Sequence, residues 1–485
     1  MQDLRQKTIR SGLAKVMGQG IGAIMRLAFM VVLARLLDPG EFGLVAMVTA
    51  ITGLLGMFAA AGLSSAAVQA RSISKAQFST LFWVNMMLGV AFALLCCALA
   101  PVLVRFYGEP RLFWLTILMA PGFLLNASSV QHLALLQREM RYATLAVVEF
   151  VGQLLGLIVG VALALAGFRY WALVGAASAA QLGVTVGLWV TTRWLPGRPG
   201  PLASVLPMLR VGWTITLNTF VTYVGYNLEK ILLGRYWGAE ALGNYGRAYQ
   251  LISVPIDNLN GAFGGVAFSA LARIQDDPAR LRHYFIQGYS LVISITVPLS
   301  LFLGFFSDQI FLVLFGPKWL EAAAIFRLMA PTVLIFSLIN PFGWLLLASG
   351  RQGRSLRTAL VIAPIVIVAC IVGLPYGPRG VATAYSTAMA LWFVPHMIWC
   401  LHGTPISVRD LLPSIGRPIM ASFVAGGLGI AVHRYTMADA APWVELVFGG
   451  GLMLGVYAAM MLLVLGQGGY YRNLFRDLRK VTVPS

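Results

Sequence analysis

The residues of this chain that could carry chemistry are a few charged side chains inside long apolar segments. Arg26 lies near the middle of the apolar run 13–37, and Glu229 and Lys230 lie together within 208–236. An ionisable residue at the centre of a bilayer costs about 2.5–3.5 kcal/mol on insertion scales, so those that are kept should face a partner or a water-filled cavity. The two cations favour an anionic ligand. The alternative is a static salt bridge between helices, with Lys230 extending outward to water.

Three further polar residues lie in apolar segments. Asp257 follows Pro255 closely, and a proline inside a helix frees a backbone carbonyl and permits a bend, so the pair could form a hinge with a titratable group beside it. Glu149 lies roughly two turns inside the run 143–167. Either carboxylate could carry a coupling proton, and the alternative for each is an ion pair with a neighbouring helix or a basic loop. Asn218 could donate a hydrogen bond to a ligand or make a contact between helices.

The elements that hold these residues are membrane-spanning helices. The chain has 485 residues and is 59% hydrophobic and only 11% charged, with a mean hydropathy of +0.81. A soluble domain has about 25% charged residues, so the composition excludes soluble domains, a disordered chain and a disulfide-rich scaffold. A span needs roughly 20 apolar residues, and long runs without strand-like alternation predict helices rather than a barrel. We predict fourteen spans: 13–37, 42–68, 78–104, 112–136, 143–167, 170–192, 208–236, 241–270, 284–306, 319–348, 357–375, 380–401, 414–433 and 444–466.

Small residues predict where two of these helices approach each other closely. Gly152, Gly156 and Gly160 recur at every fourth position and form a ridge on one face of the fifth span. We expect a neighbouring helix to pack against this ridge.

The distribution of basic residues predicts the orientation. Of the 35 Lys and Arg residues, 23 fall on one side of the predicted spans and nine on the other. Because loops rich in Lys and Arg stay on the cytoplasmic side, both termini are expected in the cytoplasm. The formal net charge of +18 is therefore interpreted as membrane orientation and not as nucleic-acid binding.

The sequence repeats itself at an interval of about 200 residues. Arg35 and Gly43 keep the same spacing as Arg235 and Gly243, and the run Leu-Met-Ala-Pro occurs at 118–121 and again at 328–331. We therefore expect two copies of a six-helix unit, residues 1–200 and 201–405, followed by two more spans and a basic cytoplasmic tail in 406–485. Because six is even, the two lobes are related by a pseudo-two-fold axis along the membrane normal, an arrangement of alternating-access transporters.

These landmarks also carry a resemblance to a known family. The chain resembles polysaccharide transporters of the multidrug/oligosaccharidyl-lipid/polysaccharide exporter superfamily, the Wzx-type oligosaccharide flippases, and in particular their WzxC-like branch. The family more often has Asp at the position of Glu229, which keeps the charge and shortens the side chain. The resemblance covers about residues 10–400 and rests on Leu33–Leu44, Ala61-Gly62-Leu63, Val68-Gln69, Asn227–Lys230, Gly234-Arg235, Leu242-Gly243 and Tyr245.

The resemblance implies a V-shaped pair of lobes around a central cavity. It also implies that the substrate is an oligosaccharide on a polyprenyl pyrophosphate carrier, flipped to the outer face of the bacterial inner membrane for exopolysaccharide, O-antigen or capsule assembly. Arg26 and Lys230 would then attract the pyrophosphate or an acidic sugar, and Asn218 would donate to a sugar. Spans 1 and 7 occupy equivalent places, so Arg26 and Glu229 are expected to approach each other across the cavity. Polysaccharide polymerase and glycosyltransferases are the expected protein partners.

Other functions fit the sequence less well. We find no P-loop motif, no metal-ligand cluster and no need for a cofactor. A membrane enzyme such as a sugar polymerase predicts a catalytic cluster in a sizeable outer loop, which the short loops do not provide. A multidrug or cation exporter on the same fold would favour acidic residues in its site, whereas Arg26 and Lys230 favour an anion.

Overall fold

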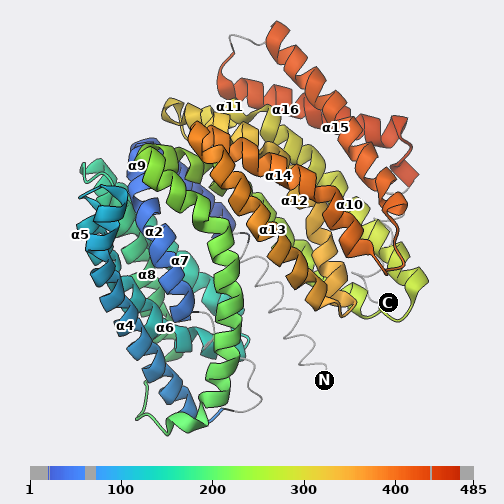
Figure 1. The fold of residues 1–485 in the computed structure, drawn as a ribbon. Coiled ribbons are helices and arrows are strands. Elements are labelled where there is room, and N and C mark those ends of the chain that lie inside the picture. Colours follow the sequence, from blue (N-terminus) through green and yellow to red (C-terminus); the bar gives the residue numbers. More distant parts are fainter. Residues whose placement is uncertain (1–19, 21, 61–72, 437–439, 470–485) are drawn as a thin grey trace. The chain divides into compact units, whose positions relative to one another are not determined.

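The structure is a computed structural model that describes residues 20, 22–60, 73–436 and 440–469 (Figure 1). The described residues form helices joined by turns and short loops, with no strand among them. Ten helical stretches in these ranges, from Pro39–Gly56 to Pro442–Val464, are long and apolar enough to cross a membrane. The predicted all-helical, polytopic membrane fold is therefore confirmed.

Every predicted span overlaps a helix in the described part of the chain. The first helix covers residues 22–36. The helices that follow it are α2 (Pro39–Ala60), α4 (Lys75–Tyr107), α5 (Leu112–Met119), α6 (Pro121–Arg138), α7 (Tyr142–Leu165), α8 (Trp171–Thr192), α9 (Leu206–Ala272), α10 (Pro278–Phe305), α11 (Ser307–Leu314), α12 (Leu320–Ala348), α13 (Gln352–Gly373), α14 (Gly377–Leu401), α15 (Val408–Thr436) and α16 (Pro442–Ala459), with short 3-10 turns at Leu202–Ser204, Pro317–Trp319 and Leu374–Tyr376 and a π-helical turn at Met460–Val464.

Two predicted spans are divided or joined differently in the structure. The fourth span is broken into α5 and α6 at Pro121, because proline has no N–H to continue the hydrogen-bond ladder. The seventh and eighth spans run together as α9, which turns sharply at Gly238. This glycine has φ 80° and ψ −175°, a conformation that a residue with a Cβ adopts only under strain.

The described residues divide into two compact units. One unit contains residues 1–247 with 374–378, and the other contains 248–373 with 379–485. The lobe boundaries predicted from the sequence repeat, at residues 200 and 405, stay predictions.

Within the first unit, the predicted glycine ridge packs against α8. A Cβ on Gly156 would lie 2.7 Å from the carbonyl oxygen of Ala176 and 2.7 Å from the Cβ of Ala180. A Cβ on Gly152 would lie 2.5 Å from Val184. Real Cβ contacts are longer than this, so glycine allows the backbones of α7 and α8 to approach each other as predicted.

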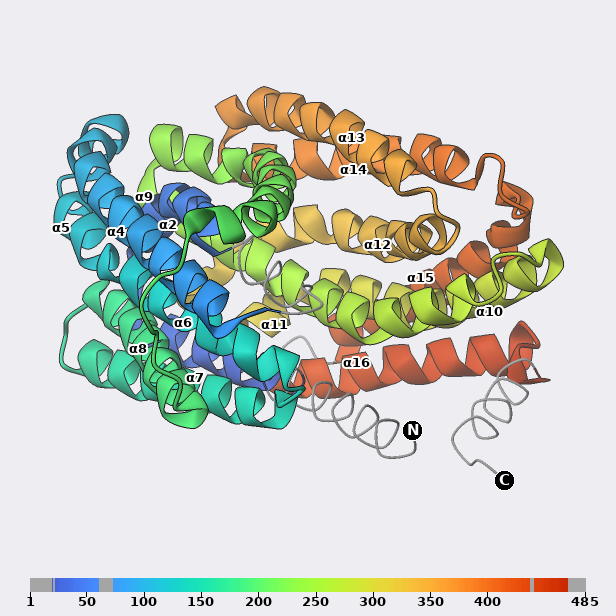
Figure 2. The ribbon, with the colours of Figure 1, turned by 90° about the horizontal axis from the view of Figure 1, so that it is seen from below.

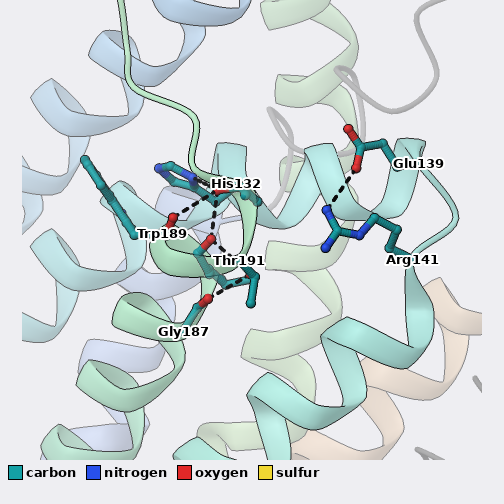
Figure 3. Close-up of polar contacts among 8 residues, drawn as sticks. His132, Glu139, Arg141, Gly187, Trp189 and Thr191 are labelled. Atoms are coloured by element: carbon teal, nitrogen blue, oxygen red, sulfur yellow. Dashed lines mark hydrogen bonds and ion pairs between the residues drawn. The ribbon is translucent and has the colours of Figure 1, made fainter.

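A buried histidine joins α6 to α8 (Figure 3). Nδ1 of His132 lies 2.7 Å from Oγ1 of Thr192, and the imidazole ring packs at 4.5 Å from the ring of Trp189. The indole Nε1 of Trp189 donates a hydrogen bond to the carbonyl of Ser128. These contacts fix the end of α8, from which the next segment starts.

That next segment, residues 193–201, runs along α4 and is hydrogen-bonded to it (Figure 2). The amide of Gly197 donates to Oγ of Ser79 at 3.0 Å, and the amide of Gly200 donates to Oγ1 of Thr80 at 2.8 Å. The indole of Trp83 donates to the carbonyl of Gly197. The connection that leads into α9 is therefore fixed to α4 by backbone hydrogen bonds.

The second unit is built around stacked aromatic rings and ion pairs at helix ends. Tyr289 on α10 stacks on Phe342 of α12, and its hydroxyl donates to the carbonyl of Leu338. Arg282 and Asp410 form a two-bond ion pair that joins the starts of α10 and α15. These contacts bring the thirteenth predicted span, in α15, onto the face of α10.

Candidate functional site

Arg26 lies on the first helix with an exposed side chain that folds back along that helix. Its Nη1 is 3.4 Å from the point where a Cβ on Gly22 would lie. Helical side chains point toward the helix N-terminus, so the guanidinium lies one turn before its own Cα. Gly22 leaves the space that this conformation uses.

The helix 22–36 lies beside α7, which carries Glu149. Leu33 Cδ1 is 3.5 Å from the Cβ position of Gly160, and this contact fixes the level of one helix against the other. Gly22 and Glu149 each come eleven residues before these two contact residues. Both helices belong to odd-numbered spans and run in the same direction, so Gly22 and Glu149 lie at the same level. The Arg26 guanidinium lies next to Gly22 and is therefore level with Glu149.

The two charges act on each other. The charges of Arg26 and Glu149 interact, and the Glu149 side chain is exposed on α7. Both side chains are therefore open to their surroundings while they lie in apolar helices. An exposed cation and an exposed anion therefore lie at one level of two adjacent helices.

Glu229 and Lys230 form a second, more buried group on α9. Glu229 is only 2% exposed, and its Oε2 has no hydrogen-bond partner among the described residues. The Lys230 ammonium donates to Oδ1 of Asn227 at 2.8 Å, and the Asn227 amide donates to the carbonyl of Tyr223. The positive charge of Lys230 acts on the Glu229 carboxylate. The Lys230 side chain is thus hydrogen-bonded along its own helix.

The predicted site residues are therefore engaged in two separate groups. Arg26 acts on Glu149, and Glu229 is coupled to Lys230. No hydrogen bond or ion pair joins Arg26 to Glu229 in the part of the chain that the structure describes. Sequence reasoning chose Glu149 as an ion-coupling residue and missed that Arg26 is its neighbour. The sequence alone carries no signal for this pairing, because it depends on the contact of Leu33 with Gly160.

Two further predicted residues lie on α9. Asn218 and Asp257 are both within the bounds Leu206–Ala272, and their side chains lie outside the described residues. Among the described residues, no group of three His, Cys, Asp or Glu side chains is placed to hold a metal ion.

α9 is held against α2 next to the buried group. The hydroxyl of Tyr223 lies 3.4 Å from the backbone carbonyls of Thr49 and Ala50, to which it donates. A Cβ on Gly53 would lie 2.2 Å from this hydroxyl oxygen, so the close approach requires glycine at position 53. The position of Lys230 and Glu229 relative to α2 therefore depends on the pairing of Gly53 with Tyr223.

Comparison with known proteins gives matches over most of the chain. Residues 32–324 match the model of a family described as "Polysaccharide biosynthesis protein". The chain is 30% identical over 383 residues to the lipopolysaccharide biosynthesis protein WzxC of Escherichia coli, covering 76% of each protein. It is also 30% identical over 399 residues to the teichuronic acid biosynthesis protein TuaB of Bacillus subtilis, covering 78% of this chain and 79% of TuaB.

A third relative and two solved structures extend this pattern. The succinoglycan biosynthesis transport protein ExoT of Rhizobium meliloti is 27% identical over 299 residues, covering 62% of this chain and 60% of ExoT. The lipid II flippase MurJ, in an inward closed conformation, superposes with a TM-score of 0.75 at 14% identity, covering 96% of this chain and all of that one. An inward-facing multidrug transporter of the MATE family gives a TM-score of 0.62 at 15% identity, covering 78% and 93%. At these identities the structures show a common fold.

Proposed function

Because this chain belongs to the polysaccharide biosynthesis protein family, among the polysaccharide transporters of the multidrug/oligosaccharidyl-lipid/polysaccharide exporter superfamily, we propose that it is a lipid-linked oligosaccharide flippase. It moves polyprenyl-pyrophosphate-linked oligosaccharides from the cytoplasmic to the outer face of the inner membrane by alternating access. The observation that carries this proposal is the 30% identity to WzxC over 76% of both proteins. The common fold with the lipid II flippase MurJ supports it.

The physical problem that the protein solves is the polarity of the sugar. An oligosaccharide cannot cross hydrocarbon unshielded, since each polar group without a hydrogen-bond partner costs several kcal/mol. The polyprenyl tail has the opposite preference and stays in lipid. The sugar and pyrophosphate therefore cross through a water-filled passage, and the tail follows outside it. No bond is made or broken in this process, so the protein is a transporter and not an enzyme.

The anion-binding part of the site is Arg26. A pyrophosphate or acidic sugar that enters competes with Glu149 for the guanidinium, which forms charge-assisted hydrogen bonds with phosphate oxygens. Release of Glu149 leaves its carboxylate without the cation that stabilises it, so the carboxylate can take up a proton. One charge that moves across 100 mV is worth about 2.3 kcal/mol, enough to drive a transport step. Consumption of the product on the outer face is the alternative source of energy.

The other predicted site residues receive roles next to Arg26, where the substrate anion replaces Glu149. Lys230 adds a second positive charge, and its hydrogen bond to Asn227 holds it on α9. Asn218 donates to the sugar, and Asp257 is a second candidate for the coupling carboxylate. Both termini are cytoplasmic. Glycosyltransferases supply the substrate on the cytoplasmic side, and a polymerase acts on the product on the outer side. The excess of Lys and Arg in the loops of one side supports this orientation.

The experiment that tests the function measures on which face lipid-linked oligosaccharides accumulate. Cells that lack the protein should accumulate the intermediate on the cytoplasmic face, and the wild-type gene should restore its appearance outside. Arg26→Gln should fail to restore it, and Arg138→Gln is the control for loss of a positive charge outside the site. If cells without the protein show a normal outer pool of the intermediate, the flippase proposal is wrong.

A further inference from the structure

A cavity of about 550 Å³ lies within the second unit, between α12 and α15. Both of these helices pack on α10, which lies beside α15 in Figure 1. The volume is typical of small-ligand pockets, which range over roughly 300–1,000 Å³. None of the site residues assigned above lines this cavity, so it is a separate feature of the protein.

Small residues create this cavity. A Cβ on Gly304 of α10 would lie 3.0 Å from the Cβ of Ala330 on α12, so these two helices touch there without a long side chain between them. A Cβ on Gly426 of α15 would lie 2.1 Å from Cε2 of Phe305 on α10. The rings of Phe305 and Phe423 meet edge-on at 6.0 Å and form one wall. The described side chains therefore leave the space between α12 and α15 unfilled.

The cavity is charged at one end and apolar at the other. Arg327 on α12 and Asp308 on α11 line it, form an ion pair with each other and keep about half of their side-chain surface exposed. Arg327 Nε also donates to Oγ of Ser307 at 3.2 Å. Leu334 lies roughly two turns further along α12, about 10 Å from the level of Arg327, and Leu301 on α10 also lines the cavity. This change of polarity is that of a membrane lipid, in which a charged headgroup is joined to apolar chains.

We propose that this cavity binds a zwitterionic phospholipid with a primary amine in its headgroup, as in phosphatidylethanolamine. The Arg327 guanidinium binds the phosphate through charge-assisted hydrogen bonds, and the Asp308 carboxylate binds the ammonium. The lipid thus replaces the contact between the two side chains with two contacts of the same kind. The upper part of one acyl chain lies along Leu334 and Phe423, and the remainder of the lipid stays in the bilayer.

The charge of the site favours a zwitterion over an anion. Arg327 and Asp308 together carry no net charge, so an anionic headgroup is attracted by the first and repelled by the second. Sites for anionic lipids are pockets in which basic residues are in excess. A polyprenyl pyrophosphate carries still more negative charge and is disfavoured for the same reason. The ligand is therefore a lipid of the surrounding bilayer, and it differs from the transported lipid of the proposed function.

The bound lipid joins α12 to α15. The cavity separates the lining residues of these two helices, Leu334 on α12 and Phe423 on α15. In a bilayer the acyl chain gains little from leaving other lipid chains, so its contribution comes from van der Waals packing against both helices and from the headgroup contacts. We therefore expect the lipid to stabilise the attachment of α15 to the second unit.

The test measures which lipid the purified protein retains. The full-length protein is equilibrated in detergent with equal amounts of phosphatidylethanolamine, phosphatidylglycerol, phosphatidylcholine and a polyprenyl phosphate, and native mass spectrometry then identifies the bound lipid. Phosphatidylethanolamine should be retained about fivefold more than phosphatidylglycerol, the most that an exposed ion pair contributes. It should also exceed phosphatidylcholine, whose quaternary ammonium has no N–H to donate to Asp308. Added phosphatidylethanolamine should raise the melting temperature of the delipidated protein.

A single substitution should reverse the selectivity. Asp308→Asn leaves the Arg327 cation without its carboxylate, so this variant should retain phosphatidylglycerol more than phosphatidylethanolamine. Glu321→Gln is the matched control, because Glu321 forms a similarly exposed ion pair with Arg379 and does not line the cavity. This control should keep the preference of the wild type.

The selectivity distinguishes a lipid site from an ion pair that only stabilises the fold. A purely structural pair predicts that Asp308→Asn lowers the melting temperature and leaves the relative retention of the lipids unchanged, and that result would overturn the proposal. So would equal retention of the four lipids by the wild type, or retention of the polyprenyl phosphate above phosphatidylethanolamine. The measurement requires no transport, so its result does not depend on the flippase proposal.

Discussion

The guanidinium of Arg26 lies folded back over Gly22, with its Nη1 3.4 Å from the point that a Cβ on this glycine would occupy. Residue 22 therefore determines whether the cation of the site can lie level with Glu149. Gly22 and Arg26 therefore act together, although only Arg26 is charged.

A larger side chain at position 22 should displace Arg26. We expect Gly22→Leu to weaken substrate binding by about 1.5–3 kcal/mol, the value of hydrogen bonds to a charged group. The measurement is uptake of a lipid-linked oligosaccharide into vesicles over a range of substrate concentrations. Gly22→Ala is the matched control and should transport normally, because a Cβ at 3.4 Å only touches the movable end of Arg26. Equal transport by the Leu and Ala variants would contradict the prediction.

Exchange of the charges at positions 26 and 149 separates a binding site from a structural ion pair. Arg26→Glu with Glu149→Arg keeps one charge of each sign on the same two helices, so the melting temperature in detergent should change little. Transport should fall at least about tenfold, since the cation no longer lies where the anion is bound. If the exchanged protein transports as well as the wild type, Arg26 and Glu149 serve only to hold the two helices together.

The contact of Gly53 with Tyr223 predicts a rescue. Gly53→Ala should destabilise the protein by about 1–3 kcal/mol, the usual cost of overpacking, because its Cβ would lie 2.2 Å from the Tyr223 hydroxyl. Tyr223→Phe removes the hydroxyl oxygen and should restore part of this loss in the double variant. Both effects can be followed as the midpoint of thermal unfolding in detergent. A double variant that is less stable than Gly53→Ala would show that the hydroxyl is not the obstacle.

The glycine ridge of α7 makes a matched comparison possible. Gly156→Ala places a Cβ 2.7 Å from both Ala176 O and Ala180 Cβ, and it should destabilise the packing of α7 on α8 by about 1–3 kcal/mol. Gly122→Ala on α6 meets nothing within 4 Å and should not destabilise the protein. Thermal unfolding of the two variants side by side measures the difference. Equal stabilities would mean that the two helices can move apart at little cost.

The turn between α4 and α5 predicts a small dependence of stability on pH. The hydrogen bonds from the Arg111 guanidinium lower the pKa of Glu109 below the ordinary value of a glutamate. The stabilisation is therefore present above the pKa of the unfolded chain, and it is lost as the pH falls through the lower pKa of the folded protein. Because the pair is partly exposed, it should amount to less than about 1 kcal/mol.

The measurement is the difference in melting temperature between the wild type and Glu109→Gln as the pH is lowered. The wild type should be slightly more stable at neutral pH, and the difference should vanish in acid. A difference that persists unchanged in acid would mean that the charge of Glu109 is not its cause.

The fold was predictable because span length, apolar composition and the Gly- and Pro-containing loops are all local features. The effect of a given proline was not. Pro121 separates α5 from α6, whereas Pro331, at the equivalent place in the second repeat, lies inside the continuous helix α12. Neighbouring helices decide whether the missing hydrogen bond ends a helix or is tolerated, and the sequence does not contain that information.

The site was predictable in its residue types and less so in its pairs. Charged residues inside apolar spans mark Arg26, Glu149, Glu229 and Lys230 individually. Which of these residues pair with each other depends on the axial position of one helix relative to the next. A shift by one helical turn would change every pair. The pair of Arg26 with Glu149 is set by contacts as distant as Leu33 with Gly160.

The contact of Gly43 with Ala239 and of Gly243 with Pro39 also bears on the origin of the chain. A surface in which residue i meets residue j and j meets i is the isologous interface of a two-fold homodimer. Pro39 with Gly243 and Ala239 with Gly43 have this form within a single polypeptide. An ancestral chain of one repeat would thus have been complementary to a second copy of itself at this glycine. Duplication and fusion would leave the two copies free to acquire different neighbours, and the position equivalent to Arg247 in the first repeat is Met47.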